Sequence, residues 1–474
     1  MKKVITLLLV LSIVLSLCAC GASQNAESTD APQQYTGLQA GFAKVQLTPS
    51  YSVSLGGYSD DATRRSEGFR THIYMTCIAV KSGEDTFLLY TFDGLNASKA
   101  VQDKMRESIL GVVDIPIDNI FIGATHCHSC PTLNMTFQGN KDYYESFLEI
   151  SAQAAQEAIT DLAPAQLMAG ADILTDENGK YMNFVRHYKM EDGSYAGSNF
   201  GNWGLTPVGH ATEGDHQLVL VKFDRGEDKK DILMVNWQAH PDRGSELGRT
   251  LIAASWVGPL RDDLEQLSGM QVAYFTGASG NQNDSSSIRE ESHGLDWEGY
   301  GKKMAQLIND KLDILQPMEG TELKQTSTQL SLDIDHSWDH MIEQADEVYD
   351  LWKSAGKAAG DALGKTYGFT NSYQANAIRN RYKMKETATL EVRAFRIGPI
   401  GFTTGTYEMF STHSLYVKEN SPFDITFIIA GNFSYLPTKE AYEYRSYEAD
   451  TGYYAAGSAE KLAENYVKML NDIK

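Results

Sequence analysis

The chain has little cysteine, little basic charge and no repeat. Five cysteines stand among 474 residues, which is too few for a disulfide framework. Lys and Arg total 41 against 62 Asp and Glu, so the formal net charge is −21. Because nucleic-acid binding needs clustered basic side chains, this composition excludes a nucleic-acid partner. No period of roughly 20 to 50 residues recurs, so a repeat architecture is excluded as well.

The chain also lacks an apolar run long enough to span a membrane. The apolar run at residues 4–17 is too short to cross a bilayer core of about 30 Å. It follows two lysines and is typical of a signal peptide. It ends in Leu-Cys-Ala-Cys at 17–20, which resembles a bacterial lipobox; an ordinary secretory peptide is the alternative. We predict a lipoprotein signal peptide over 1–19 and a flexible tether over 20–37. A lipid on Cys20 would anchor the protein to the membrane on the extracytoplasmic side of the cell envelope.

Apolar residues make up 42% of the chain, enough for a large core. Strand and helix patterns interleave over 38–474, which predicts an α/β fold: one large domain with a central mixed β-sheet flanked by helices and a site at the strand carboxyl ends. Strands are expected at 119–124, 217–223, 232–237, 272–275, 388–396 and 425–429. Helices are expected at 97–110, 142–162, 259–267, 297–315, 338–363 and 459–473. The charged, Tyr-rich segment 336–387 interrupts this rhythm and indicates a helical insertion, either a solvated excursion or a lid.

Histidines follow two of these strands. Thr-His-Cys-His-Ser at 125–129 comes directly after the first, and residues two apart in an extended chain share a face. His240 follows the strand at 232–237. A single such histidine is more often structural, but imidazoles on two strand ends suit a zinc ion. The Cys-x-x-Cys at 127–130 lacks the second pair of a structural zinc site and a thioredoxin-like context, so we do not expect a redox function.

Two further segments carry candidate chemistry. The loop at 276–285 contains Gly277 and Gly280 and ends in amide and acidic residues; exposed backbone amides in such loops bind oxyanions, although most are simple turns. Near the carboxyl end, Glu408 follows an apolar strand, and six tyrosines are packed into residues 435–454. Such density is as typical of core aromatics as of a site.

Together these segments resemble the neutral ceramidase family, zinc-dependent amidases that hydrolyse the N-acyl bond of ceramide. The resemblance rests on the strand and Thr-Pro at 40–49, Leu-Gly-Gly-Tyr at 55–58, Thr-His-Cys-His-Ser at 125–129 and the segment from Tyr435 to Glu448. It covers roughly residues 38–474 as ordered motifs, with weak identity between them.

The resemblance implies a set of site residues. The zinc ligands would be His126, His240, Glu408 and Tyr435. Beside them, His128 would deliver a proton, Arg186 would contact substrate and Tyr447 would hydrogen-bond the developing oxyanion. The implied reaction is hydrolysis of an amide by metal-activated water, and the implied partner is a small-molecule or lipid amide. The sequence specifies no oligomeric state.

The chain departs from the family at two points. Asn283 stands where the family has an active-site serine, and an amide cannot act as a nucleophile. Few residues follow the Tyr447 motif, so we expect no counterpart of the family's immunoglobulin-like carboxyl-terminal domain. Two alternatives therefore stay open: a zinc esterase or deacetylase acting on another envelope substrate, and a binding lipoprotein without catalysis.

Overall fold

The computed structural model describes residues 37–58, 63–135, 137–197, 200–201, 204–243, 249–431 and 434–474. The predicted signal peptide, Cys20 and the tether up to residue 36 lie outside the described residues. Within the described part of the chain, no helix is both long and apolar enough to span a bilayer. Helices and strands alternate along residues 38–474, and the predicted α/β class with one large domain is confirmed.

The strands form three main mixed sheets, whereas the sequence predicted a single central one. The first has the order β5 (Ile120–Ala124), β4 (Asp85–Phe92), β3 (Tyr74–Ser82), β1 (Leu38–Gln46) and β6 (Ala163–Pro164). The second has the order β16 (Gln271–Thr276), β14 (Ile232–Trp237), β13 (Gln217–Asp224), β7 (Gln166–Ile173) and β18 (Gln316–Pro317). The third has the order β19 (Leu323–Asp333), β20 (Thr387–Ile397), β21 (Ile400–Gly405) and β23 (Ile425–Ala430).

One apolar core joins the three sheets. Phe121 of β5 stacks on Phe395 of β20, with ring centroids 3.8 Å apart. Phe275 of β16 meets Phe427 of β23 edge to face at 5.6 Å. These rings belong to one buried cluster to which all three sheets contribute, and burial of such apolar surface is the main stabilising term. The sheets are therefore held in fixed relation by packing rather than by strand pairing.

Each main sheet contains one parallel pair, and these pairs position the site. β4 runs parallel to β5, β14 to β16, and β21 to β23. In parallel pairs both carboxyl ends lie at the same edge, which is where α/β folds place their ligands. The segments that follow β5, β14, β16, β21 and β23 carry nearly all of the predicted site residues.

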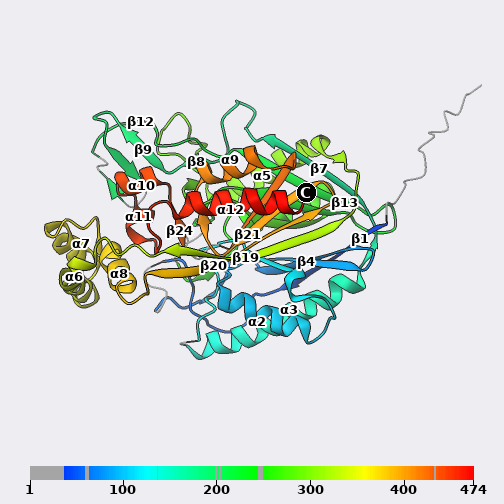
Figure 1. Ribbon diagram of the computed structural model, residues 1–474, viewed down its shortest axis with the longest axis horizontal. Coiled ribbons are helices and arrows are strands. Elements are labelled where there is room, and N and C mark those ends of the chain that lie inside the picture. The colour runs from blue at the N-terminus through cyan, green and yellow to red at the C-terminus, as the bar shows by residue number, and fades with distance from the viewer. Residues whose placement is uncertain are drawn as a thin grey trace, which may run out of the picture. The chain divides into compact units, whose positions relative to one another are not determined.

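Helices cover the outer faces. They are α2 (Lys99–Leu110), α3 (Gln138–Thr160), α4 (Val257–Ser268), α5 (Trp297–Asp310), α9 (Ser411–Asn420), α10 (Lys439–Glu443), α11 (Tyr447–Thr451) and α12 (Ser458–Asp472). Figure 1 shows α2 and α3 along the outer face of the first sheet, where α3 packs on β1 and β3. α12 packs against the third sheet and α9.

Smaller sheets lie near the strand ends. The four-stranded one has the order β11 (Phe200–Gly201), β10 (Tyr195–Gly197), β9 (His187–Met190) and β12 (Pro207–His210). Three two-stranded sheets pair β2 (Gly68–Phe69) with β15 (Leu251–Ile252), β8 (Phe184–Val185) with β17 (Gln282–Asn283), and β22 (Glu408–Met409) with β24 (Tyr435–Leu436).

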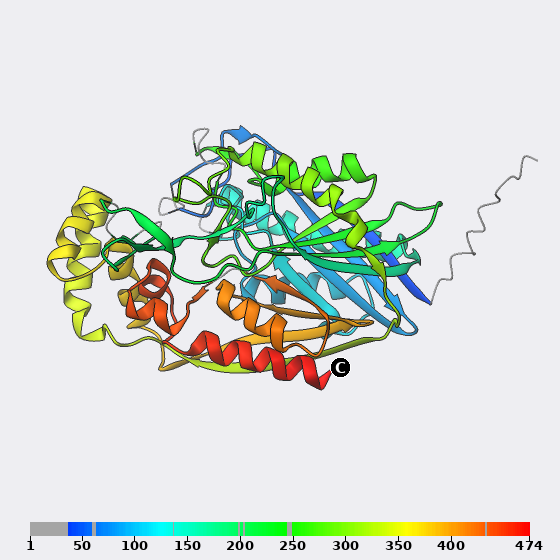
Figure 2. The same cartoon turned by 90° about the horizontal axis from the view of Figure 1, so that it is seen from above.

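The segment 336–387 contains three α-helices, α6 (Ile342–Ala355), α7 (Lys357–Thr366) and α8 (Ser372–Arg381), which stand together at one end of the large domain (Figures 1 and 2). The single helix predicted at 338–363 is wrong, because Gly356 adopts φ +92° and separates α6 from α7. The three helices bury a small core of their own around Val348, Phe369 and Ile378.

Candidate metal centre

Three histidines converge beyond the ends of β5 and β14. The Nε2 atoms of His126 and His240 lie 3.0 Å apart, and the Nε2 atom of His128 lies 3.2 Å from each of them. His126 and His240 are 3% and 1% exposed, whereas His128 is only partly buried. The two histidines predicted on separate strand ends therefore meet, and the third joins them.

The local backbone turns these side chains inward. His126 comes two residues after β5 ends at Ala124, and it adopts φ +65°, a left-handed conformation rare for a residue with a Cβ atom. The backbone N–H of His240 donates to Gln282 at 2.8 Å, and the N–H of His128 donates to Pro241 at 3.3 Å. The loops after β5, β14 and β16 are thus bonded to one another around the histidines.

The other ring nitrogens fix the orientation of two imidazoles. His126 Nδ1 lies 2.6 Å from the carbonyl oxygen of Leu95, and His240 Nδ1 lies 3.2 Å from that of Ser279. A carbonyl can only accept, so each Nδ1 carries the proton and each Nε2 presents its lone pair toward the centre of the cluster. This arrangement is the usual support for metal-ligating histidines.

Glu408 completes the cluster. Its Oε2 atom lies 3.4 Å from His126 Nε2 and 4.0 Å from His240 Nδ1. The residue is 5% exposed, and Oε2 has no hydrogen-bond partner among the described residues. A buried carboxylate oxygen without a partner is costly, and a cation is what satisfies it. Glu408 on β22 pairs with Tyr435 on the parallel β24, which brings the fourth predicted ligand alongside.

The residues present fit a metal ion. Bonds of about 2.0–2.1 Å in tetrahedral geometry require nitrogens roughly 3.3 Å apart, close to the 3.0 Å observed between the Nε2 atoms of the two predicted histidine ligands, His126 and His240. Across the described ranges, no other group of His, Cys, Asp and Glu offers three ligand atoms within 4.8 Å of one another.

Burial and the neighbouring His126 lower the pKa of His128 and of His240 well below the usual value, which keeps both imidazoles neutral. Burial also lowers the pKa of His126, but Glu408 outweighs it and the net shift is upward.

Arg186 and Tyr447 adjoin this centre. Arg186 follows β8, and its Nη2 atom donates to the Tyr435 hydroxyl at 3.3 Å. The ring of Tyr447 lies edge to face with the ring of Tyr435, with centroids 6.1 Å apart. Tyr447 also meets Tyr373 of α8 at 5.9 Å, so the helical insertion touches the site.

The sequence missed the residues that hold Arg186. Its Nε donates to Glu448 Oε1 at 2.8 Å, and the other oxygen of Glu448 lies 2.7 Å from His187 Nε2. All three side chains are nearly fully buried. Burial alone would raise the pKa of Glu448, but His187 and Arg186 lower it to about 2. Glu448 belongs to the segment from Tyr435 to Glu448 that resembles the ceramidase motif, although no role could be assigned to it from the sequence. Nothing in the sequence indicated His187 as a site residue, because its partner Glu448 is 261 positions away.

Asn283 lies beside His240 of the cluster. It forms a backbone bridge with His240, and its Oδ1 atom is buried without a hydrogen-bond partner among the described residues. Gly280 of the same loop is tightly packed: a Cβ there would stand 2.8 Å from the carbonyl oxygen of Glu408. The glycine lets the loop after β16 lie directly on β22.

The Leu-Gly-Gly-Tyr segment at 55–58 requires a glycine at position 57. Gly57 has φ +109°, and a Cβ on it would lie 2.6 Å from the Cα of His128. Only glycine permits both the conformation and the approach.

Cys127 and Cys130 are fully buried free thiols, and Cys127 Sγ donates to the carbonyl oxygen of Ala254 at 3.0 Å. Both cysteines pack the segment that carries His128.

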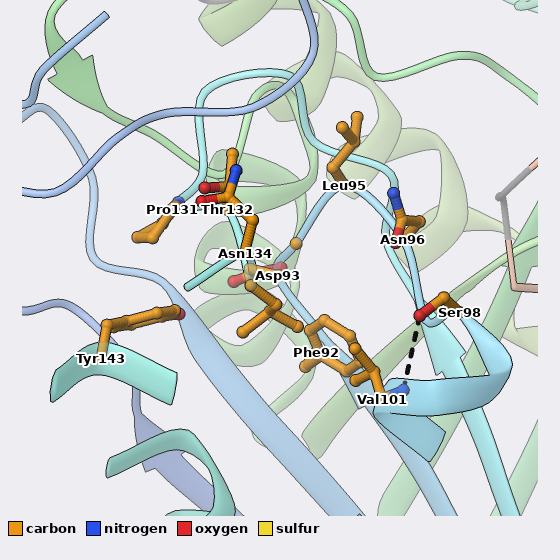
Figure 3. Close-up of a pocket in the computed structure, with 12 residues that line it drawn as sticks. Phe92, Asp93, Leu95, Asn96, Ser98, Val101, Pro131, Thr132, Asn134 and Tyr143 are labelled. Atoms are coloured by element: carbon orange, nitrogen blue, oxygen red, sulfur yellow. Dashed lines mark hydrogen bonds between the residues drawn. The ribbon is translucent and has the colours of Figure 1, made fainter. Parts of the chain in front are cut away.

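A cavity of about 280 Å³ is lined partly by residues from the chain segments that adjoin the histidines (Figure 3). Leu95, whose carbonyl oxygen binds His126, forms part of its wall, and Thr132 and Pro131 come from the segment just after His128. Phe92, Val101 and Tyr143 add apolar surface, and Asn96 and Asn134 add amides. The lining of this cavity is therefore of mixed polarity, and none of the histidines of the cluster belongs to it.

No protein-family model and no curated protein matches the sequence, but solved structures match the fold. Neutral ceramidase from Pseudomonas aeruginosa superposes with a TM-score of 0.66 at 14% identity, over 92% of this chain and 74% of that one. This chain has a neutral ceramidase-like fold. A ceramidase complexed with C2 gives a TM-score of 0.65 at 14% identity, over 92% of this chain and 75% of the other. The resemblance seen in the motifs is thus confirmed for the fold.

Proposed function

We propose that the protein is a zinc-dependent hydrolase that cleaves the N-acyl amide bond of a ceramide-like lipid. The observation that carries the proposal is the cluster itself: three Nε2 atoms within 3.2 Å of one another beside the unpartnered Glu408 Oε2. It lies at the strand ends of a fold shared with neutral ceramidases.

Two imidazoles, a carboxylate and a phenol would hold the ion, namely His126, His240, Glu408 and Tyr435. When bound, zinc supplies a Lewis acid and lowers the pKa of a coordinated water toward about 7. His128 is the most exposed of the three histidines. Its neutral imidazole would take a proton from the attacking water and deliver it to the leaving nitrogen.

Neighbouring side chains orient the substrate. The Tyr447 hydroxyl donates a hydrogen bond to the carbonyl oxygen as charge develops there. The Asn283 amide contributes a second donor in place of the family's serine, so no covalent acyl intermediate forms on this residue. Arg186, held by Glu448, keeps the Tyr435 hydroxyl in position and contacts the substrate.

The lipid substrate agrees with the proposed anchor. The lipobox-like motif ending at Cys20 would hold the enzyme at the outer surface of the membrane, within reach of lipid amides. A single acyl chain binds membranes only marginally, so stable anchoring requires the several chains typical of a bacterial lipoprotein.

A substrate panel tests the proposal. The purified full chain is assayed with fluorogenic N-acyl amides, matched esters and acetylated sugars, each with and without a zinc chelator. We expect chelator-sensitive cleavage of a long-chain amide. Cleavage of only the esters or sugars would replace the amidase by an esterase or deacetylase, and no turnover of any substrate at full zinc occupancy would favour a binding protein.

A further inference from the structure

The helical insertion 336–387 packs on α11, the short helix that carries Tyr447 and Glu448. The helix of the insertion that lies against it is α8, and the two are neighbours in Figure 1. α11 has five residues, and a helix of that length is not stable in water by itself. Its position therefore depends on the elements that surround it.

The insertion holds the turn that leads into α11. Arg445 in this turn adopts φ +58°, a left-handed conformation that is unfavourable for a residue with a Cβ atom. Its guanidinium group donates to the carbonyl oxygen of Gly368 at 3.0 Å and to Gln374 Oε1 at 2.9 Å. Both acceptors belong to the insertion, so these bonds fix the direction in which the chain enters α11.

The insertion also holds the end of α11. Asp450 is 7% exposed, and its carboxylate accepts from the hydroxyl of Thr370 and, at 3.3 Å, from Gln374 Nε2. The carbonyl groups at the end of a helix lack partners within it. Arg381 of α8 is buried and supplies one, because it donates to the carbonyl oxygen of Gly452 at 2.7 Å.

A ring contact joins the insertion to the site itself. The ring of Tyr373 on α8 meets the ring of Tyr447 edge to face, with centroids 5.9 Å apart. Tyr447 in turn meets the ring of Tyr435, a predicted metal ligand, at 6.1 Å. The insertion therefore contacts the side chain that the proposed reaction uses, as well as both ends of the helix that carries it.

We propose that the helical insertion holds α11 in place for catalysis, with Tyr373 and Thr370 as positioning residues for Tyr447 and Glu448. The roles of Tyr447 and Glu448 rest on the proposed function. The insertion is then a fixed part of the site and neither a lid nor a solvated excursion. A lid would break the bonds of the buried Asp450 each time it opened, and bonds to buried charged groups are costly to lose.

The test is hydrogen–deuterium exchange, followed by mass spectrometry, on the purified full chain and its variants. Tyr373→Ala removes the ring contact, and Thr370→Val removes the hydroxyl group at nearly constant side-chain size. We expect the backbone amides of residues 447–452 to exchange about tenfold faster in each variant. Peptides from the strands of the metal centre should exchange as in the parent.

Conservative variants and a matched control separate positioning from general damage. Tyr373→Phe keeps the ring and Thr370→Ser keeps the hydroxyl group, so both should exchange like the parent. Tyr349→Ala removes a partly buried tyrosine ring of the same insertion. That ring meets Trp352 within α6, so its loss should leave the exchange of α11 unchanged.

Amide turnover per bound zinc is the second measurement. We expect Tyr373→Ala and Thr370→Val to lower kcat by roughly 10- to 10²-fold, since a small displacement of a catalytic group has an effect of this size. KM should stay nearly constant, because Tyr447 acts on the transition state. Turnover is referred to bound zinc, so molecules that have lost the fold do not contribute.

The proposal is overturned if both folded variants keep the parent's exchange rates over residues 447–452, or if Tyr349→Ala accelerates exchange there as much as they do. It is also overturned if α11 exchanges faster while turnover per zinc stays at the parent's level. A parent without amidase activity would refute the proposed function instead, and the exchange rates would still decide whether the insertion holds α11.

Discussion

At the scale of single residues, Asn283 distinguishes this chain from the ceramidases that it resembles. Its amide can donate a hydrogen bond to an oxyanion, and loss of one such donor costs about 10²- to 10³-fold in turnover. We expect Asn283→Ala to lose activity by that factor at unchanged zinc content, and Asn283→Ser to keep or improve it. Turnover of a fluorogenic N-acyl amide at equal zinc content measures both. Unchanged turnover of the Ala variant would remove Asn283 from the site.

Glu448 tests the buried network at the same scale. Its pKa is lowered to about 2 from an ordinary 4.5, so its stabilising effect is complete above about pH 4.5 and is lost as the pH falls toward 2. We expect Glu448→Gln to lower the free energy of unfolding by about 3–5 kcal/mol at pH 7, since it leaves Arg186 buried without its charge partner. The gap between variant and parent should narrow at pH 3.

Guanidinium denaturation at both pH values measures this gap. The exposed Glu319→Gln provides the control and should differ little from the parent at either pH. A gap that stays constant or widens on acidification would show that ionised Glu448 is not the stabilising form.

Site residues that follow a strand could be predicted from the sequence, whereas a pair of residues far apart along the chain could not. His126 and His240 could be predicted because each lies two or three residues after the end of a strand, and strand ends are visible in the sequence. The pairing of His187 with Glu448 could not, since it depends on β9 and α11 meeting across 261 positions. His128 was predicted beside the metal, and only the folded backbone shows that its Nε2 lies 3.2 Å from each of the other two Nε2 atoms, which are 3.0 Å apart.

At the scale of elements, the turn at Gly57 supports the strand-end loop that carries His128. Gly57→Ala would place a Cβ 2.6 Å from the Cα of His128, so the loop must move. We expect this variant to lose most of its bound zinc and activity. Gly83 is the matched control, because it also has positive φ but nothing lies within 4 Å of its Cβ position. The measurement is the zinc content of Gly57→Ala and of the control Gly83→Ala. Equal zinc occupancy in the two variants would contradict the role of Gly57.

Apart from the helix at 338–363, the helices and strands that the sequence predicted lie within a few residues of the observed bounds, because their apolar periodicity is strong. β5, β14 and β16 are short, buried runs of this kind. β19 was missed because its eleven residues are mostly polar and its strand form depends on pairing with β20 along its whole length. The separation into three sheets was missed for a related reason: which strands pair is a long-range property that local patterns do not contain.

At the scale of the whole molecule, the described residues form one large domain with the proposed metal centre, and the proposed anchor lies before them. Replacing Cys20 by Ser removes the thiol that would carry the lipid. We expect Cys20→Ser to leave the membrane fraction while zinc content and turnover stay at the parent's level, because the site is built entirely from residues after 37. Fractionation followed by immunoblotting measures the distribution. Equal membrane retention of variant and parent would contradict the lipoprotein prediction.

The central claim is that one metal centre carries the hydrolase activity. The most direct measurement is zinc content and amide turnover, determined together, for the parent, His126→Ala, His240→Ala and the control His336→Ala, whose histidine lies in the helical insertion. We predict about one zinc per chain in the parent and the control, and a joint loss of zinc and turnover in the two cluster variants. Full zinc occupancy in both cluster variants, or full turnover after their zinc is lost, would contradict the account.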